Sequence, residues 1–382
     1  MATIFYGVAG EGRGHAARAF ALVEALKHEH EMILYASGHA YEMLAPVYLG
    51  TDVQVYRLPD VAFRYDGEGK LSYLRTGLGN AHYIWRLPQL VRMVLRHMDR
   101  KKPDLVLSDF EPVLPRAANE AGIPFLSVDH QHFLLHYDLQ GLQPKLRNYA
   151  NFMAPFITAW YQGQAESVVS SFYFPPLKPT TERVTQIGVL LRDEVRHAAV
   201  TDEGHLVAYV RRDADDAFLD ALRDCGRPVK AYGLGERAPR GSLSFHPIHP
   251  VTFIEDLASC TALVTTAGNQ LVGESLFLGK PVLALPEVGN FEQEINAHFL
   301  VQGGGGLKAE LERLSSLDVQ RFIDAVPTLR QRIDRQRIDG LPAAVERIEA
   351  HLAAPVRPSS VNEPVKVYAA LLQAAVRPAY LV

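Results

Sequence analysis

Short runs of apolar, mostly β-branched residues alternate along the chain with longer segments in which apolar residues recur every three or four positions. The short runs are typical of buried strands in a parallel sheet, and the longer segments of helices that cover it. Strands are expected at 3–8, 32–36, 53–58, 104–107, 123–128, 168–174, 206–210, 229–232, 262–265 and 282–285. This alternation predicts an α/β fold.

The length of 382 residues is large for one core, so two domains are expected. A stiff Pro-Pro-Leu-Lys-Pro connector at 175–179 interrupts the alternation, which restarts at Leu206. The expected parts are a first domain at 1–175, a second domain at 204–351, and a C-terminal tail at 352–382 with a final helix at 365–376. Two Rossmann-like domains are therefore predicted to face a central cleft, since ligands favour such interfaces.

The strongest functional signal lies in the stretch Thr261–Leu300. A buried strand ends at Thr265, a turn follows at Thr266–Asn269, and a helix then runs to Leu278. Such a turn lies at the carboxyl edge of a parallel sheet, where open α/β sheets bind ligands. The N-terminus of the following helix attracts phosphate. This turn is therefore a predicted phosphate site.

A second glycine-rich turn, Gly10–His15, follows the first strand. It resembles the dinucleotide fingerprint Gly-x-Gly-x-x-Gly, but His15 replaces the third glycine, which disfavours a nicotinamide cofactor. A histidine suits acid–base chemistry near neutral pH, although it could also simply pack on its helix. Asp109 ends a later strand at the same edge. Its carboxylate can orient the His15 ring, or it can cap the helix that begins near Pro112.

Composition bounds the class of protein. The chain is 48% hydrophobic and 21% charged, and its formal net charge of −4 gives no nucleic-acid footprint. Only Cys225 and Cys260 are present, which favours a reducing cytoplasm. No apolar stretch reaches the ~20 residues of a membrane span. For Tyr83–Arg100 we expect a core helix with a solvated basic face, and its alternative is peripheral contact with anionic lipid.

These motifs resemble the nucleotide-sugar signature of the GT-B glycosyltransferases. The plant-type UDP-sugar enzymes carry His-Cys-Gly-Trp-Asn-Ser-x-x-Glu, and Thr266–Glu274 keeps its glycine and glutamate at the same spacing. Gly279–Pro281 and Glu292–Ala297 match the remainder of the signature. The Gly-x-Gly-His turn and Ser108–Pro112 resemble a bacterial and archaeal branch of the superfamily, related to the lipid-intermediate transferases of cell-wall synthesis.

The resemblance implies a site for a nucleoside diphosphate sugar, with UDP-sugar favoured, and neither a cofactor nor a metal. Thr266 and Asn269 stand where the plant-type signature has His and Trp. Glu274 is implied to accept hydrogen bonds from the ribose hydroxyls. The expected donor contacts are Gly12, Gly14, Ile254, Thr266, Gly268, Asn269, Gln270, Glu274, Glu292, Gln293 and Asn296.

The implied catalytic pair is His15 as base with Asp109 behind it. One direct displacement would invert the anomeric carbon, and the helix after Gly268 would stabilise the leaving diphosphate in place of a metal. His130 and His132 are expected to contact the acceptor or to belong to a capped turn. Metal ligation together with Asp129 is their other alternative. An Asp-x-Asp motif at 213–216 opens an expected helix, so we interpret it as a cap and first-turn acids rather than as a metal site.

The sequence therefore predicts a cytoplasmic hexosyltransferase that joins a sugar to an unidentified small molecule, glycan or lipid. A nucleotide-sugar 2-epimerase of the same fold is the first alternative, and it needs no second substrate. A non-catalytic nucleotide-sugar binding protein is the second. Product analysis without an acceptor separates the transferase from the epimerase.

Overall fold

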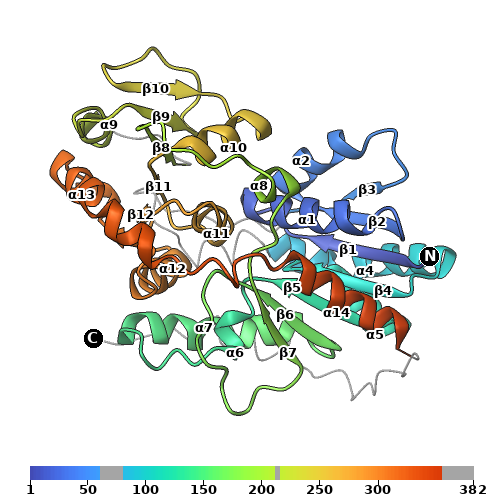
Figure 1. Cartoon of the computed structure of the whole chain (residues 1–382). Coiled ribbons are helices and arrows are strands. Elements are labelled where there is room, and N and C mark those ends of the chain that lie inside the picture. The colour runs from blue at the N-terminus through green and yellow to red at the C-terminus, as the bar shows by residue number, and fades with distance from the viewer. Residues whose placement is uncertain (61–80, 211–215, 355–382) are drawn as a thin grey trace.

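The computed structural model describes residues 1–60, 81–210 and 216–354 (Figure 1). Two parallel sheets are flanked by helices, which confirms the expected α/β class and the two Rossmann-like domains. The final helix expected at 365–376 lies outside the described residues.

The first sheet has seven strands in the order β3-β2-β1-β4-β5-β6-β7. Its strands are β1 (Thr3–Val8), β2 (Glu31–Ala36), β3 (Gln54–Arg57), β4 (Leu105–Asp109), β5 (Phe125–Asp129), β6 (Glu166–Ser170) and β7 (Val184–Ile187). Its helices are α1 (Arg13–Leu26), α2 (Gly38–Tyr48), α4 (Ala81–Lys101), α5 (Val113–Ala121), α6 (Phe133–His136) and α7 (Pro144–Trp160). Successive residues of β1 face opposite sides, so Phe5 packs with α4 and α5 whereas Tyr6 packs with α1.

The second sheet has six strands in the order β10-β9-β8-β11-β12-β13. Its strands are β8 (Leu206–Tyr209), β9 (Val229–Tyr232), β10 (Leu243–His246), β11 (Ala262–Thr265), β12 (Val282–Ala284) and β13 (Gly306–Lys308). Its helices are α9 (Asp216–Arg223), α10 (Pro250–Ser259), α11 (Asn269–Phe277), α12 (Phe291–Gln302), the 3-10 turn η1 (Leu311–Arg313) and α13 (Ser316–Arg332). In both sheets the strand order reverses beside the first strand, so the β1/β4 and β8/β11 edges are the expected ligand crevices.

Two adjacent segments join the domains. The outgoing segment contains Gly188 and Val189 and leads to α8 (Asp193–Arg196), and the returning segment contains Gly340. The main-chain N–H of Gly340 donates to the Val189 carbonyl at 2.9 Å. A Cβ atom added to Gly340 would lie 2.1 Å from the Gly188 carbonyl oxygen, so only glycine permits this close crossing.

The last described helix, α14 (Leu341–Ala353), packs on the first sheet beside α1 and β7, whereas we expected the second domain to extend to residue 351. Figure 1 shows it in red among the blue and green elements of the first domain. The buried carboxylate of Glu166 on β6 explains this placement. It accepts hydrogen bonds from Arg347 at 2.6 Å and from His351 at 2.8 Å.

Three strands were missed by the sequence analysis. These are β7 and β10, of four residues each, and β13, of three residues. All three are edge strands with only partial burial, so they lack a continuous apolar run. The strand expected at 168–174 ends at Ser170. The residues after it leave the sheet and turn toward the second domain.

Candidate active site

The N-termini of two helices meet between the domains. Helix α1 begins after Gly12 and α11 begins after Gly268. A Cβ atom added to Gly14 would lie 3.7 Å from the Cβ of Gln270, so the first turns of the two helices are in contact. In the described part of the chain, no acceptor meets the main-chain N–H groups of Gly268, Asn269 and Gln270. Two positive helix ends with open donors make a site for an anion such as a diphosphate.

The left-handed residue of the turn before α11 is an alanine rather than the glycine. Gly268 has an ordinary φ of −69°, and Ala267 instead takes the left-handed conformation with φ of 58°. Phe110, which follows β4 at the other crevice, has φ of 56°. A non-glycine residue in this region costs about 1–2 kcal/mol, so the surrounding structure must hold it there.

His15 and Asp109 are brought together as the sequence analysis expected. His15 lies in the first turn of α1, and its Nδ1 is 2.8 Å from Oδ1 of Asp109 at the end of β4. The Asp109 side chain is completely buried, and that of His15 is 9% exposed.

Arg18 completes this group and was not found from the sequence. Its Nε and Nη2 donate to the two Asp109 oxygens at 3.1 and 2.8 Å. Burial alone would raise the pKa of Asp109, but the charges of Arg18 and His15 outweigh it and lower that pKa below its usual value. The one available signal was position, since Arg18 lies three residues after His15 on the same helical face.

The charge of Asp109 fixes the tautomer of His15. Nδ1 of His15 lies 2.9 Å from Arg18 Nη2 as well as 2.8 Å from the carboxylate. Arg18 already donates to Asp109, and a hydrogen bond from a ring N–H to an anion is the stronger one. We therefore assign the proton to Nδ1, which leaves the lone pair of Nε2 free to accept a proton.

The capping alternative for Asp109 is wrong, because Glu111 caps α5. The Glu111 carboxylate accepts hydrogen bonds from the main-chain N–H groups of Val113 at 2.8 Å and Leu114 at 2.9 Å. Burial raises the pKa of Glu111 to about 7, although these two hydrogen bonds act to lower it. Asp109 is therefore free to serve His15.

Glu274 and Gln270 lie together on α11 behind its first turn. The Glu274 side chain is 3% exposed, and Arg192 donates to its two oxygens at 3.2 and 3.1 Å. Gln270 Nε2 donates to the same carboxylate at 3.0 Å. Arg192 comes from the outgoing segment between the domains and was not anticipated. A ribose bound at Glu274 would accordingly donate to a carboxylate that Arg192 also contacts.

Two other expected donor residues bridge the domains. The Asn269 amide donates to the Ser170 carbonyl at 3.1 Å and accepts from the Phe172 N–H at 3.3 Å. Asn296 on α12 donates to the Ala267 carbonyl at 3.0 Å and reaches first-domain side chains through its oxygen. Both amides therefore fix the turn before α11 to its surroundings.

The remaining expected donor residues do not converge on one point. Gln293 folds back onto Glu287, accepting from its N–H at 2.8 Å. Glu292 accepts from Gln131 of the first domain at 3.4 Å. The Ile254 side chain is buried in α10 as part of the core. Thr266 follows β11 and leads into the turn.

A protein-family model described as glycosyl transferase family 1 matches residues 2–327. The chain belongs to this family. The expected membership of the GT-B superfamily is thereby confirmed, and the protein is a glycosyltransferase. No curated protein matches the chain in sequence.

Solved structures resemble this glycosyltransferase over nearly its whole length. The glycotransferase of kitacinnamycin is 16% identical with a TM-score of 0.67, over 92% of this chain and 99% of that one. UGT89C1 of Arabidopsis thaliana, complexed with UDP-L-rhamnose, is 15% identical with a TM-score of 0.64, over 92% and 99%. MurG of Acinetobacter baumannii is 15% identical with a TM-score of 0.58, over 92% and 100%. At these identities the likeness is one of fold.

The two histidines expected to contact an acceptor have separate environments in the glycosyltransferase. His132 Nδ1 lies 2.7 Å from Asp129, and its Nε2 is buried with no partner in the described ranges. His130 instead contacts Ser170 and Asn296 between the domains. The pair therefore does not share a ligand position.

Of the segment 213–216, which contains the Asp-x-Asp motif, only Asp216 is described. It lies in the first turn of α9 and pairs with Arg240 at 2.6 Å, whereas 213–215 lie outside the described residues. Within the described ranges, the one group of ligand-type side chains close enough to hold a metal is Glu29, His30 and Glu349, between α1 and α14. No described helix is long and apolar enough to cross a bilayer.

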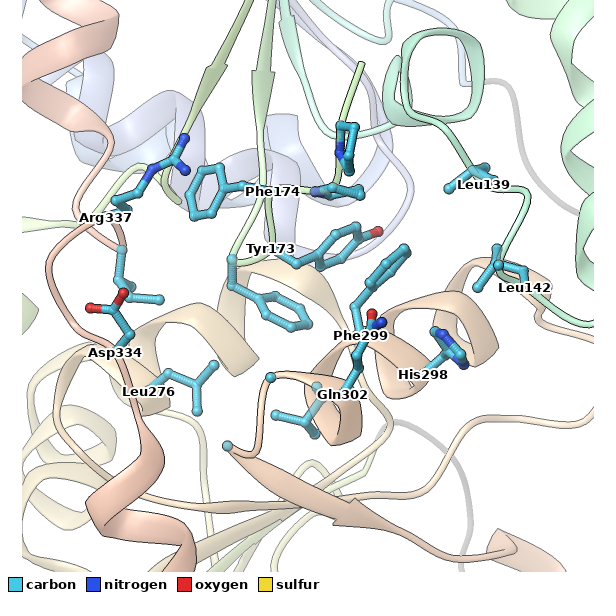
Figure 2. A pocket seen from close by; sticks show the side chains of 18 of the residues that line it. Leu139, Leu142, Tyr173, Phe174, Leu276, His298, Phe299, Gln302, Asp334 and Arg337 are labelled. Carbon is cyan, nitrogen blue, oxygen red and sulfur yellow. The ribbon is translucent and has the colours of Figure 1, made fainter. Parts of the chain in front are cut away.

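A cavity of about 550 Å³ lies between the domains of the glycosyltransferase (Figure 2). Its wall includes Tyr173 and Phe174 after β6 and Phe299 on α12. The Tyr173 and Phe299 rings stack with centroids 4.3 Å apart. None of the expected site residues lines this cavity.

Proposed function

We propose that this glycosyltransferase moves a hexosyl group from a nucleoside diphosphate sugar, with UDP as the favoured carrier, to an acceptor hydroxyl. The observation that supports this most is the His15–Asp109–Arg18 group beside two helix N-termini with open N–H groups. It combines a base with a binding site for an anionic leaving group, which are the two requirements of such a transfer.

In the proposed step, His15 Nε2 takes the acceptor proton while the acceptor oxygen forms a bond to the anomeric carbon. The bond from that carbon to the diphosphate oxygen breaks, and the diphosphate leaves with the electron pair. Asp109 stabilises the imidazolium formed on His15. The N–H groups that open α11 meet the developing negative charge, which is the role a metal would otherwise take. One displacement inverts the anomeric centre.

The choice of a UDP-sugar draws on the GT-B neighbours. UGT89C1 of Arabidopsis thaliana was solved with UDP-L-rhamnose and, separately, with quercetin. This fold therefore accommodates a UDP-sugar in one of these two structures and quercetin in the other.

The proposal is tested in two stages. A thermal-shift screen against nucleotides and nucleotide sugars identifies the donor, because a ligand of the native state raises the melting temperature. Products from that donor are then analysed by NMR with and without an acceptor mixture. Transfer with inverted anomeric configuration supports the proposal. Isomerised donor in the absence of an acceptor would identify an epimerase, and binding without any turnover would identify a binding protein.

We also propose that a cytoplasmic enzyme of this kind meets anionic lipid through α4. Its outer face carries exposed arginines without ion pairs in the described ranges: Arg86, Arg92, Arg96 and Arg100. Beside them Trp85 is 72% and Ile84 52% exposed. Unpaired cations next to exposed aromatic and aliphatic side chains suit the headgroup region of an anionic bilayer.

Vesicle binding tests this contact. Trp160→Phe leaves Trp85 as the single tryptophan, because the chain has two. Its emission should shift to shorter wavelength with vesicles containing phosphatidylglycerol and remain unchanged with pure phosphatidylcholine. Adding Arg92→Glu and Arg96→Glu should abolish the shift. An identical response to both vesicle types would reject an electrostatic lipid contact.

A further inference from the structure

The side-chain amide of Asn296 connects three parts of the molecule. It is completely buried on α12, and its Nδ2 donates to the carbonyl of Ala267 at 3.0 Å. Its Oδ1 accepts a hydrogen bond from the Tyr173 hydroxyl at 2.9 Å. Tyr173 belongs to the segment that leaves β6, so the first domain is joined through one amide to the turn before α11.

The hydrogen bond from Asn296 to the Ala267 carbonyl controls the direction of the next main-chain N–H, that of Gly268. In a planar trans peptide the carbonyl of one residue and the N–H of the next point in opposite directions. Because the Ala267 carbonyl points at Asn296, the N–H of Gly268 points away from Asn296. The left-handed φ of Ala267, 58°, is a conformation that such an outside contact must stabilise.

Tyr173 is the dependable donor to this amide. His130 Nε2 also lies 3.1 Å from Asn296 Oδ1, but His130 Nδ1 faces the Ser170 carbonyl at 3.0 Å. Burial lowers the pKa of His130 and favours its neutral form, which donates through one nitrogen only. The Tyr173 hydroxyl lies 2.9 Å from the same oxygen and keeps its proton, because burial raises the pKa of Tyr173 well above its usual value.

The ring of Tyr173 is held independently of its hydroxyl. It stacks on Phe299 with ring centroids 4.3 Å apart (Figure 2). It also forms a T-shaped contact with Phe172, with ring centroids 4.9 Å apart. Its other side faces the cavity between the domains. Removing the hydroxyl alone therefore leaves the packing of the interface in place.

We propose that Tyr173 and Asn296 are positioning residues that set the N–H groups of α11 relative to His15. This inference rests on the proposed function, since those N–H groups are the proposed contacts of the leaving diphosphate. Neither side chain is required to touch the substrate. They act through the Ala267 peptide, whose orientation decides whether the Gly268 N–H meets the phosphate.

Tyr173→Phe is the test, with Tyr48→Phe as its matched control. Tyr48 is 3% exposed and donates to Glu24 at 3.1 Å, away from the second domain. Each variant removes one buried hydroxyl and keeps its ring. Tyr173→Phe should weaken UDP binding by about threefold to tenfold, the usual effect of one hydrogen bond, and should raise the donor KM while the acceptor KM stays unchanged. Tyr48→Phe should change neither.

A second readout needs no ligand. Amide hydrogen exchange at Val272, whose main-chain N–H donates to the Gly268 carbonyl at 3.1 Å, should accelerate in Tyr173→Phe and stay at the wild-type rate in Tyr48→Phe. Asn296→Asp keeps the acceptor for Tyr173 but turns a donor into an oxygen facing the Ala267 carbonyl, so it should accelerate exchange further. Unchanged exchange and unchanged UDP affinity in Tyr173→Phe would overturn the positioning role. Failure of the wild type to bind any nucleotide would overturn the proposed function, while the exchange comparison would still decide the positioning role.

Discussion

The proposed base, His15, depends on neighbours that engage its Nδ1 so that its Nε2 can accept a proton. Asp109 and Arg18 form a buried ion pair, and His15 lies against the carboxylate of that pair. Breaking such a pair would leave a buried charge, which is strongly destabilising, so the group is expected to remain ionised throughout catalysis. His15 is therefore the only member of the group that needs to change its charge during the reaction.

His15→Ala should lower the transfer rate by about 10²–10⁴-fold while nucleotide affinity stays close to wild type. Asp109→Asn should also lower the rate, because an amide no longer stabilises the imidazolium. The losses in the double variant should be smaller than the product of the single losses, since the two residues act as a unit. Initial rates and donor affinities of all three variants provide the check. Wild-type rates in His15→Ala would remove His15 as the base.

Glu274→Ala should weaken nucleotide binding by about tenfold or more, the cost of lost hydrogen bonds to a charged group. Because Arg192 is the present partner of this carboxylate, Arg192→Ala is the informative control. A carboxylate that serves the ribose should retain nucleotide affinity when Arg192 is removed. Calorimetry distinguishes the cases, and equal losses in the two variants would make Glu274 a partner of Arg192 alone.

At this scale the sequence predicts some residues and misses others for a physical reason. His15 and Asp109 both follow strands of one parallel sheet, so their meeting can be expected from topology. Arg18 and Arg192 do not follow strands in this way, and an arginine side chain is long enough to reach many partners, so their contacts could not be predicted. Asn296 was expected at the donor and instead contacts Ala267, since sequence spacing places a residue near a turn but does not say which atoms it meets.

The helices and strands themselves follow the apolar pattern wherever they are buried. The central strands were predicted within a few residues, because every side chain in them faces a core. Gly279 follows the end of α11 with a left-handed φ of 70°, a conformation that glycine adopts readily after a helix. The pattern failed at β7, β10 and β13, whose edge positions require fewer apolar residues.

Because the ends of α1 and α11 supply the proposed electrostatic stabilisation, transfer should survive removal of divalent metals. The assay is repeated after exhaustive treatment with EDTA and dialysis into metal-free buffer. We expect at least half of the initial rate to remain. Loss of activity that magnesium or manganese restores would assign the leaving-group role to a metal.

Glu166 should make the attachment of α14 sensitive to acid. Burial would raise the pKa of Glu166, but hydrogen bonds from His351, Arg347 and Thr185 lower it to about 2. The ionised form is thus favoured in the folded state, so its stabilisation is present above the ordinary pKa of 4.5 and is lost as the pH falls toward 2.

Urea unfolding measured between pH 5 and pH 2.5 tests this assignment. The free energy of unfolding should fall with pH in the wild type and fall less steeply in Glu166→Gln, which cannot ionise. The variant should also be the less stable protein at pH 7. Parallel pH profiles for the two proteins would show that Glu166 does not provide this acid sensitivity.

The whole molecule is two doubly wound domains in which the second is inserted into the first. The number of domains and their order were predictable, because the alternation of strands and helices restarts once. The return of α14 was not, since its apolar face would fit either sheet. Its position is decided by Glu166 and by the close crossing of Gly188 and Gly340, which only the folded chain reveals.

This arrangement predicts which fragments fold. Residues 1–191 alone should fail to unfold cooperatively, because β7 and the first sheet lose the cover of α14. The same residues joined by a short glycine–serine linker to 338–354 should melt in one transition, since the Gly340 N–H and the Val189 carbonyl are already 2.9 Å apart. Calorimetry of the two fragments makes the comparison. Equal cooperative melting of both would show that α14 is dispensable.

The position of α14 also sets an order of events on the ribosome. The first domain is mostly synthesised before the second begins, yet its last helix emerges after the second domain is complete. Domains usually fold in the order in which they are made. Here the second domain can fold first, while the domain that carries His15 waits for α14. A chain whose synthesis stops before α14 would therefore expose apolar residues of the first sheet that α14 normally covers.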